Sequence, residues 1–178
     1  ELRDMMYTAS SYDGGPFIIR YPRGYGENVP WKDVEFKRLE PGKGVWLVEG
    51  RDIAIIAAGP FAHRSAEAAG AFAHQNGFSP SVYNIRYVKP VDGAILEEAC
   101  AKHKVVLTVE DGCIAGGLHG AVAEFAADRG YDVKICPLGI PDRFISQASQ
   151  KEQRAECSLT SEGILTVLLS EYGNLQKK

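Results

Sequence analysis

The segment 104–125 limits what this chain can fold into more than any other stretch. It opens with Val105–Val109, an unbroken apolar run that is typical of a strand buried on both faces of a parallel sheet. The adjacent glycines Gly116 and Gly117 follow, and apolar residues recur at helical spacing from Leu118 onward. The segment therefore predicts a strand, a turn and the amino end of a helix. In an open α/β sheet this corner lies at the carboxyl ends of the strands, where ligands dock, and the glycines indicate a close approach of backbone or ligand.

The same alternation of strand and helix patterns runs through the chain from Val45 onward. Strands are predicted at residues 45–48, 53–58, 81–86, 105–109 and 133–136, and helices at residues 61–76, 91–102, 118–130 and 160–172. Alternating strands and helices form right-handed βαβ units. We therefore expect an α/β fold of three layers, in which a mostly parallel sheet of about five strands carries helices on both faces. The short strand 45–48 is the expected antiparallel edge.

The beginning of the chain has a different pattern. Residues 1–11 are helix-like and residues 17–21 are a strand candidate. One helix and one strand cannot bury a core of their own, so we interpret residues 1–24 as the end of a preceding domain. Residues 25–44 are irregular and contain several glycines and prolines, which favours an interdomain linker. Residues 45–178 form the main predicted domain.

Composition excludes several classes of protein. A chain of 178 residues with a net charge of −3 supports one domain and gives no sign of a nucleic-acid partner. No apolar run reaches the ~18 residues that would span a membrane. The cysteines at positions 100, 113, 136 and 157 are widely spaced and match no zinc or redox pattern. This usage favours the reduced thiols of a cytoplasmic protein.

The best binding-site candidate is the segment R-Y-P-R-G, which contains Arg20 and Arg23. A predicted strand ends here, and Pro22 interrupts it, so Arg23 can turn toward the carboxyl end of the sheet. The guanidinium group matches phosphate or carboxylate through two parallel hydrogen bonds. Composition alone favours the simpler interpretation, that both arginines are solvated or ion-paired on the surface.

Other residues that carry chemistry have structural explanations. Glu110 and Asp111 are a possible carboxylate pair, but acids at this position more often cap a turn or the following helix. No two histidines show metal-ligand spacing, so we expect no metal site, and His119 is interpreted as structural or solvated. The loop 139–145 carries an exposed aromatic residue and a charge pair, which suit a docking surface and a plain loop equally.

Four segments together resemble one enzyme family. They are R-Y-P-R-G at residues 20–24, R-Y-V-K-P-V-D at 86–92, T-V-E-D-G-C-I-A-G-G at 108–117 and L-G-I-P-D-R-F-I at 138–145. Their order and spacing resemble the carboxyl-terminal third of the 1-deoxy-D-xylulose-5-phosphate synthase family, within the thiamine-diphosphate-dependent transketolase superfamily. The third segment is shared across that superfamily, whereas the first and last are more specific to the synthases.

The resemblance implies that residues 1–24 end a pyrimidine-binding domain and that residues 45–178 are a transketolase carboxyl-terminal domain. The intact enzyme would be a cytoplasmic homodimeric transferase that uses thiamine diphosphate and Mg²⁺. It would join pyruvate to glyceraldehyde 3-phosphate with loss of CO₂, for isoprenoid, thiamine and pyridoxal synthesis. By family analogy Arg23 would bind the substrate phosphate, with Arg20 beside it. The catalytic and metal-binding residues would lie upstream of residue 1, so we expect the fragment alone to bind no cofactor and to be inactive.

Two other interpretations remain open at this point. The chain could belong to another transketolase-like enzyme, such as a 2-oxoacid dehydrogenase β subunit, or be a free-standing assembly module. The arginine pair separates the synthase from the first alternative, because two arginines suit an acceptor substrate that carries a phosphate. Two stretches depart from the synthase pattern, namely residues 117–120 and 146–148. We therefore assign His119 no role and leave the role of the 139–145 loop open.

Overall fold

The computed structural model describes residues 1–23 and 32–177. The chain divides into two compact units, an amino-terminal unit of residues 1–41 and a carboxyl-terminal unit of residues 42–178. The helix predicted at the start of the chain is present as α1 (Leu2–Ser10).

The strand predicted at residues 17–21 is wrong, because the structure assigns no strand there. A strand persists only where a neighbour satisfies its backbone N–H and C=O groups. Within the described residues of the amino-terminal unit, no second strand is present to do so. The β-branched pattern of F-I-I-R-Y therefore indicates an extended conformation. Among the described residues, no strand pairs with this segment, so it is not a strand itself.

Hydrogen bonds and a contact between the rings of Tyr7 and Phe36, 5.3 Å apart at their centroids, hold the amino-terminal unit together. Arg3 donates to two backbone carbonyls of the segment 34–39, each at 2.9 Å. The Thr8 hydroxyl, which is buried, accepts the N–H of Leu39 at 2.8 Å. Large apolar side chains stay exposed, among them Met6, Ile18 and Phe36. The described part of this unit is therefore an extended segment fastened along a helix.

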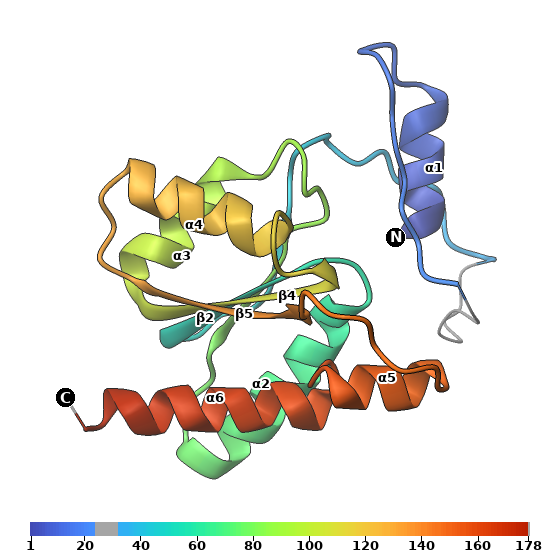
Figure 1. Cartoon of the computed structure of the whole chain (residues 1–178). Coiled ribbons are helices and arrows are strands. Elements are labelled where there is room, and N and C mark those ends of the chain that lie inside the picture. The colour runs from blue at the N-terminus through green and yellow to red at the C-terminus, as the bar shows by residue number, and fades with distance from the viewer. Residues whose placement is uncertain (24–31, 178) are drawn as a thin grey trace. The chain divides into compact units, whose positions relative to one another are not determined.

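The carboxyl-terminal unit is built on a five-stranded sheet in the order β1-β3-β2-β4-β5 (Figure 1). Its strands are β1 (Val45–Val48), β2 (Asp52–Ala57), β3 (Ser81–Asn84), β4 (His103–Cys113) and β5 (Lys134–Ile140). Its helices are α2 (Phe61–Asn76), α3 (Gly93–Lys102), α4 (Leu118–Asp128), α5 (Gln150–Glu156) and α6 (Ser161–Leu175). Only β1 is antiparallel to its neighbour, so the predicted fold class and the edge strand are confirmed.

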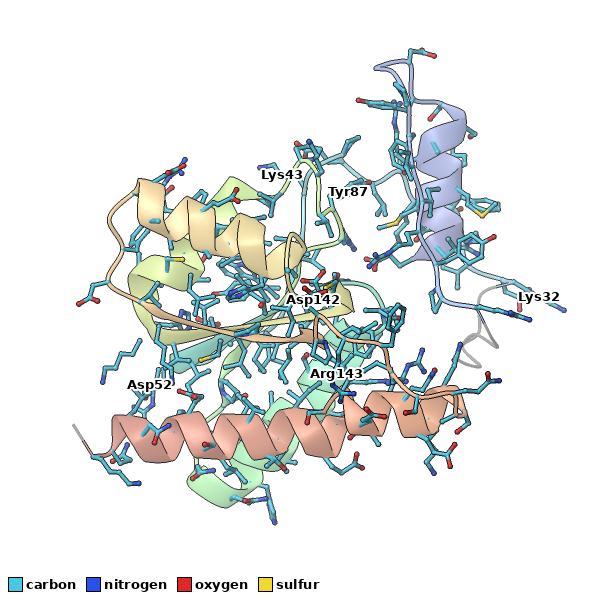
Figure 2. The ribbon with its side chains drawn as sticks, in the orientation of Figure 1. Lys32, Lys43, Asp52, Tyr87, Asp142 and Arg143 are labelled. Carbon is cyan, nitrogen blue, oxygen red and sulfur yellow. The ribbon has the colours of Figure 1, made fainter. Side chains whose placement is uncertain are left out.

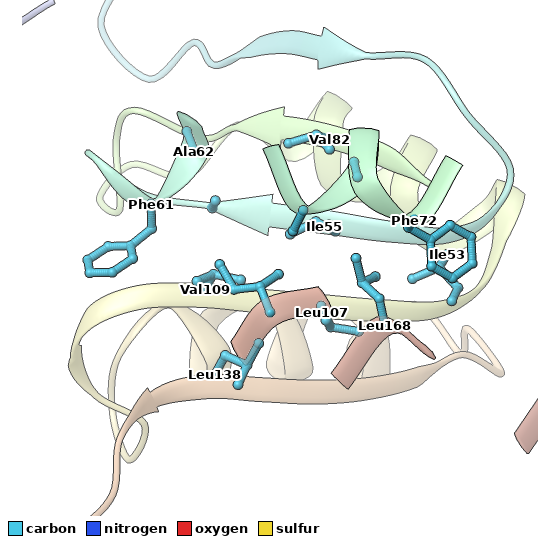
Figure 3. Close-up of a cluster of buried hydrophobic side chains, with 14 of the residues drawn as sticks. Ile53, Ile55, Phe61, Ala62, Phe72, Val82, Leu107, Val109, Leu138 and Leu168 are labelled. Atoms are coloured by element: carbon cyan, nitrogen blue, oxygen red, sulfur yellow. The ribbon is translucent and has the colours of Figure 1, made fainter. Parts of the chain in front are cut away.

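Each face of the sheet buries its own apolar cluster. Alternate residues of β2 point to opposite faces, with Ile55 toward α2 and α6 and Ile56 toward α3 and α4. Leu107 of β4 and Leu168 of α6 join the first cluster (Figure 3). Because both faces are covered, β2 is apolar along almost its whole length, as parallel strands usually are.

Side-chain hydrogen bonds cap the amino ends of two helices. The Asp92 carboxylate caps α3 by accepting the N–H of Ala94 at 3.0 Å, and it also accepts the N–H of Gly44 at 3.1 Å. The Thr160 hydroxyl caps α6 by accepting the N–H of Gly163 at 3.1 Å.

Two strands are longer than their local sequence indicates, and one helix is not predicted. β4 continues through Glu110 to Cys113 after a register shift, because β5 supplies partners up to Ile140. β5 passes through Pro137, which an edge strand tolerates since one side of its backbone needs no ladder partner. Helix α5 was missed, although Ser149 and Glu152 form a reciprocal capping box at its start.

Candidate functional site at the carboxyl edge of the sheet

A buried carboxylate organises the corner that follows β4. Glu110 is only 4% exposed, and its Oε1 accepts the backbone N–H of His119 at 3.2 Å. His119 lies in the first turn of α4, where N–H groups have no partner within the helix. The partial positive charge at the amino end of α4 also stabilises the negative charge of this carboxylate. The prediction that this acid caps the following helix is therefore confirmed for Glu110.

The two glycines have different explanations, a positive φ at Gly116 and the Glu110 carboxylate at Gly117. Gly116 adopts a φ of +75°, which favours glycine. A Cβ added at Gly117 would lie 2.4 and 2.5 Å from the Glu110 carboxylate oxygens and 2.6 Å from the carbonyl oxygen of Cys113. The group that comes close to this backbone is thus the side chain of Glu110.

Two buried polar atoms, the Oγ1 of Thr108 in the middle of β4 and the Nδ1 of His119 in the first turn of α4, have no hydrogen-bond partner in the described part of the chain. Buried polar atoms usually find a partner, so these two have unused hydrogen-bonding capacity. No pattern in the sequence points to Thr108, because a threonine inside an apolar strand is ordinary.

A cavity of about 240 Å³ lies on the same edge of the sheet. Its lining includes Asp111 from the end of β4, Ile140 from the end of β5 and Arg154 from α5. This position fits the rule that open α/β sheets form crevices at the carboxyl ends of their strands.

The loop after β5 leads from that edge to α5. Phe144 in this loop is fully exposed, as predicted. Arg143 (labelled in Figure 2) pairs with Glu156 of α5 at 2.7 Å. The loop is thus anchored to the domain by an ion pair while its aromatic side chain remains in solvent.

Arg20 and Arg23 lie in the amino-terminal unit. Both are exposed, and the strand expected to orient them is absent. The carboxyl-edge cavity is lined wholly by residues of the other unit. A phosphate-binding role for the two arginines stays a prediction.

The amino end of β4 holds a second polar cluster. The Nε2 atom of His103 lies 2.8 Å from the Ser81 hydroxyl, and its Nδ1 lies 3.0 Å from the carbonyl oxygen of Ala99. A ring protonated at Nδ1 alone satisfies both contacts, since Nδ1–H donates to the carbonyl and Nε2 accepts from the hydroxyl. Burial lowers the pKa of His103 below its usual value. This histidine is therefore a structural, neutral one.

Within residues 1–23 and 32–177, no group of three His, Cys, Asp or Glu side chains is arranged to hold a metal ion. Over the same residues, no helix combines the length and apolarity needed to cross a bilayer. The four cysteines carry free thiols.

Comparison with known proteins gives one family match. Residues 42–164 match the family described as "Transketolase, C-terminal domain". Among solved structures, a split-gene transketolase described as an inactive beta4 tetramer superposes with a TM-score of 0.70 at 28% identity, covering 80% of this chain and 46% of that one. A transketolase from Campylobacter jejuni superposes with a TM-score of 0.52 at 18% identity, covering 72% of this chain and 18% of that one, which supports the fold alone.

Several curated relatives carry the name 1-deoxy-D-xylulose-5-phosphate synthase. The protein from Phocaeicola vulgatus is 44% identical over 170 residues, which are 96% of this chain and 27% of the relative. The protein from Cytophaga hutchinsonii is 41% identical over 178 residues, 99% of this chain and 28% of the relative. The chain thus spans about a quarter of the length of the curated relatives it matches.

Proposed function

Because the chain belongs to the family of transketolase carboxyl-terminal domains, we propose that it is the carboxyl-terminal part of a 1-deoxy-D-xylulose-5-phosphate synthase. The observation that carries this proposal is the extent of the match to the curated synthases. It reaches 178 residues with the Cytophaga hutchinsonii protein, whereas the shared domain covers only residues 42–164. The similarity therefore includes the amino-terminal unit with its R-Y-P-R-G segment. A general transketolase-type domain explains only the second unit.

The proposed domain assignment follows from the same match. Residues 1–24 would end the pyrimidine-binding domain, residues 25–44 would be the linker and residues 45–178 would be the carboxyl-terminal domain. The division of the chain into units at residues 41 and 42 supports a boundary in this region. The segment 34–39 is bonded to α1, so the second half of the linker would travel with the first domain.

The intact enzyme would condense pyruvate with glyceraldehyde 3-phosphate and release CO₂. We assign thiamine diphosphate and Mg²⁺ to the portion of the relatives that this chain does not span. Mg²⁺ is bound by carboxylate oxygens, and the described residues hold no clustered set that fits it. The chain by itself would then be inactive. A homodimer and a cytoplasmic location belong to the same proposal.

Within this chain, Arg23 is the residue proposed to bind the phosphate of the acceptor substrate, with Arg20 as the weaker partner. Two features support the role. The side chain is exposed at the end of an extended segment, and a guanidinium group forms paired, charge-assisted hydrogen bonds with phosphate.

The test is Arg23→Ala in the full-length synthase. Loss of a charge-assisted bidentate contact typically costs about 1.5–3 kcal/mol. We therefore expect kcat/KM for glyceraldehyde 3-phosphate to fall roughly ten- to hundredfold. A non-phosphorylated aldehyde should be affected far less, because it never uses the contact.

Arg129→Ala is a matched control, since it removes an exposed guanidinium from the residue that follows α4 and should leave kcat/KM for both aldehydes unchanged. Equal losses for the two aldehydes in Arg23→Ala would show that Arg23 is structural. A full-length protein with no condensation of pyruvate and glyceraldehyde 3-phosphate at all would overturn the proposed reaction itself.

A further inference from the structure

An open pocket of about 540 Å³ lies in the carboxyl-terminal unit, where the amino ends of three helices contribute to one lining. Arg64 comes from the first turn of α2, and Lys151 and Arg154 come from α5. The start of α6, residues 160–162, completes the wall. Three cationic side chains therefore face one volume.

The two arginines are held in place by the same aromatic ring. The guanidinium carbon of Arg64 lies 5.3 Å from the centroid of Phe61, and that of Arg154 lies 5.8 Å from it. Phe61 is fully buried, so the ring is a fixed point for both. Arg64 is further anchored through Nη1, which donates to the carbonyl of Leu159 at 3.1 Å. Two like charges are thus preorganised beside each other.

These cations outnumber the acids that line the pocket. Among the described residues, no carboxylate forms an ion pair with Arg64, Lys151 or Arg154. Glu162 is the single acidic residue in the lining, against three cations, while Glu152 and Glu67 stand behind it on the hydroxyls of Ser149 and Ser161. The pKa of Glu162 is lowered by its own backbone N–H, by the Thr160 side chain and by the nearby charges of Lys151 and Arg64. Cations that outnumber the acids in the lining of a pocket favour an anionic ligand.

The neutral polar groups of the pocket are largely occupied within the chain. The Ser149 hydroxyl donates to the Glu152 carboxylate, and the Ser161 hydroxyl donates to the Glu67 carboxylate. The Thr160 hydroxyl accepts the N–H of Gly163. They are therefore poorly available to the hydroxyls of a sugar or to a base. Recognition in this pocket would rest on the charge of the ligand more than on its organic part.

We propose that this pocket binds a small phosphate-bearing metabolite, a phosphate monoester or a diphosphate, through Arg64, Arg154 and Lys151. Guanidinium groups match the geometry of phosphate oxygens, and the ammonium group of Lys151 adds a point charge. The partial positive charge at the amino end of α6 adds to the positive charge of these side chains. The pocket volume falls within the usual range for small-molecule sites. The proposal stands on the contacts of residues 61–162 and does not depend on the reaction proposed above.

The direct test is calorimetric titration of the 178-residue chain with pyrophosphate at low ionic strength, with inorganic phosphate as the smaller probe. We expect saturable binding that weakens as salt is added, and tighter binding of pyrophosphate than of phosphate. Amide resonances of residues 149–163 should shift along the titration in ¹⁵N-correlation spectra. Absence of binding, or shifts located elsewhere, would overturn the proposal.

Substitutions then identify the residues. Arg154→Gln should weaken pyrophosphate binding about tenfold or more, since it removes one charge-assisted contact. Lys151→Gln should weaken it by a smaller factor, and this exposed position keeps the test valid even if Arg154→Gln fails to fold. Arg129→Gln is the matched control, because that arginine also lies over a phenylalanine ring, Phe125, but outside the pocket.

The control should retain the wild-type affinity. If Arg129→Gln weakens pyrophosphate binding as much as Arg154→Gln does, the binding reflects the overall charge of the protein and the proposed site does not exist. Citrate that binds as tightly as pyrophosphate would contradict the preference for phosphate.

Discussion

The amino-terminal and carboxyl-terminal units differ in what holds them together. In residues 42–178 a sheet is covered on both faces, and Ile53, Ile55 and Leu107 have no exposed surface. In residues 1–41 side-chain hydrogen bonds and a ring contact between Tyr7 and Phe36 join α1 to an extended segment, and Ile18 is 90% exposed. The first arrangement gains stability from apolar burial, which is the dominant favourable contribution to folding. In the second, Leu39 is the one buried apolar side chain among the residues described, so that contribution is small.

The carboxyl-terminal unit has its own buried core, whereas the amino-terminal unit leaves large apolar side chains such as Met6 and Ile18 in solvent. Three sets of measurements test the difference in stability that this burial predicts.

The largest effect is expected from truncation in the core of the carboxyl-terminal unit. Leu107→Ala should lower the free energy of unfolding by about 2–5 kcal/mol, because it removes buried methyl groups and leaves a cavity at the centre of β4. Ile18→Ala in the amino-terminal unit should change it by no more than about 0.5 kcal/mol, since that side chain is already in solvent. Urea unfolding followed by circular dichroism measures both. Comparable losses would mean that the two units share one core.

A smaller effect is expected from adding one methyl group at matched glycines. Gly117→Ala places a Cβ 2.4 Å from the buried Glu110 carboxylate and should cost about 1–3 kcal/mol of unfolding free energy. Gly14→Ala places a Cβ 2.5 Å from the hydroxyl oxygen of Tyr12. That ring is only partly buried and can swing away, so we expect a change within about 0.5 kcal/mol.

Gly120→Ala controls for helix propensity, because nothing lies within 4 Å of a Cβ added there. It should stabilise α4 by about 0.5–1 kcal/mol. Thermal unfolding ranks the three variants by their change in Tm. A stable Gly117→Ala protein would show that Glu110 can move, contrary to its role as a fixed cap.

The smallest effect is the pH dependence of stability near neutrality. All four histidines lie at position 63 or later, so the amino-terminal unit contributes none. The pKa of His103 is lowered in the folded state by burial. As pH falls below about 6.5, the unfolded chain binds a proton that the folded protein does not, and stability decreases until the pH passes the folded-state pKa.

We therefore expect Tm to fall between pH 7 and pH 5 and expect His103→Gln to flatten this part of the profile. His63→Gln, on the exposed face of α2, should leave the slope unchanged. An unaltered slope in His103→Gln would locate the titration in another residue.

The alternation of elements in the carboxyl-terminal unit follows from the sequence alone. Apolar runs such as Val105–Val109 and helical spacing from Leu118 mark the strands and helices, because burial on both faces or on one face sets the period of apolar residues. The caps at Asp92 and Thr160 are local as well, since they act on N–H groups only two or three residues away, although the sequence left Thr160 and Ser161 as alternatives for the last helix. The family was visible from the same motifs, and the proposed role of Arg23 depends on that resemblance.

Features that need a partner far away in the chain depend on the tertiary structure. β4 extends beyond Glu110 because β5 pairs with it, and the segment 17–21 is no strand because none of the strands in the described residues pairs with it. The reason for Gly117 is likewise a carboxylate seven positions earlier, brought close by the turn. The cation pocket joins Arg64 to Arg154, ninety positions apart, and their shared contact with Phe61 has no signature in local sequence. Periodicity reports which face of an element is buried, but which residues meet across the fold is set by packing.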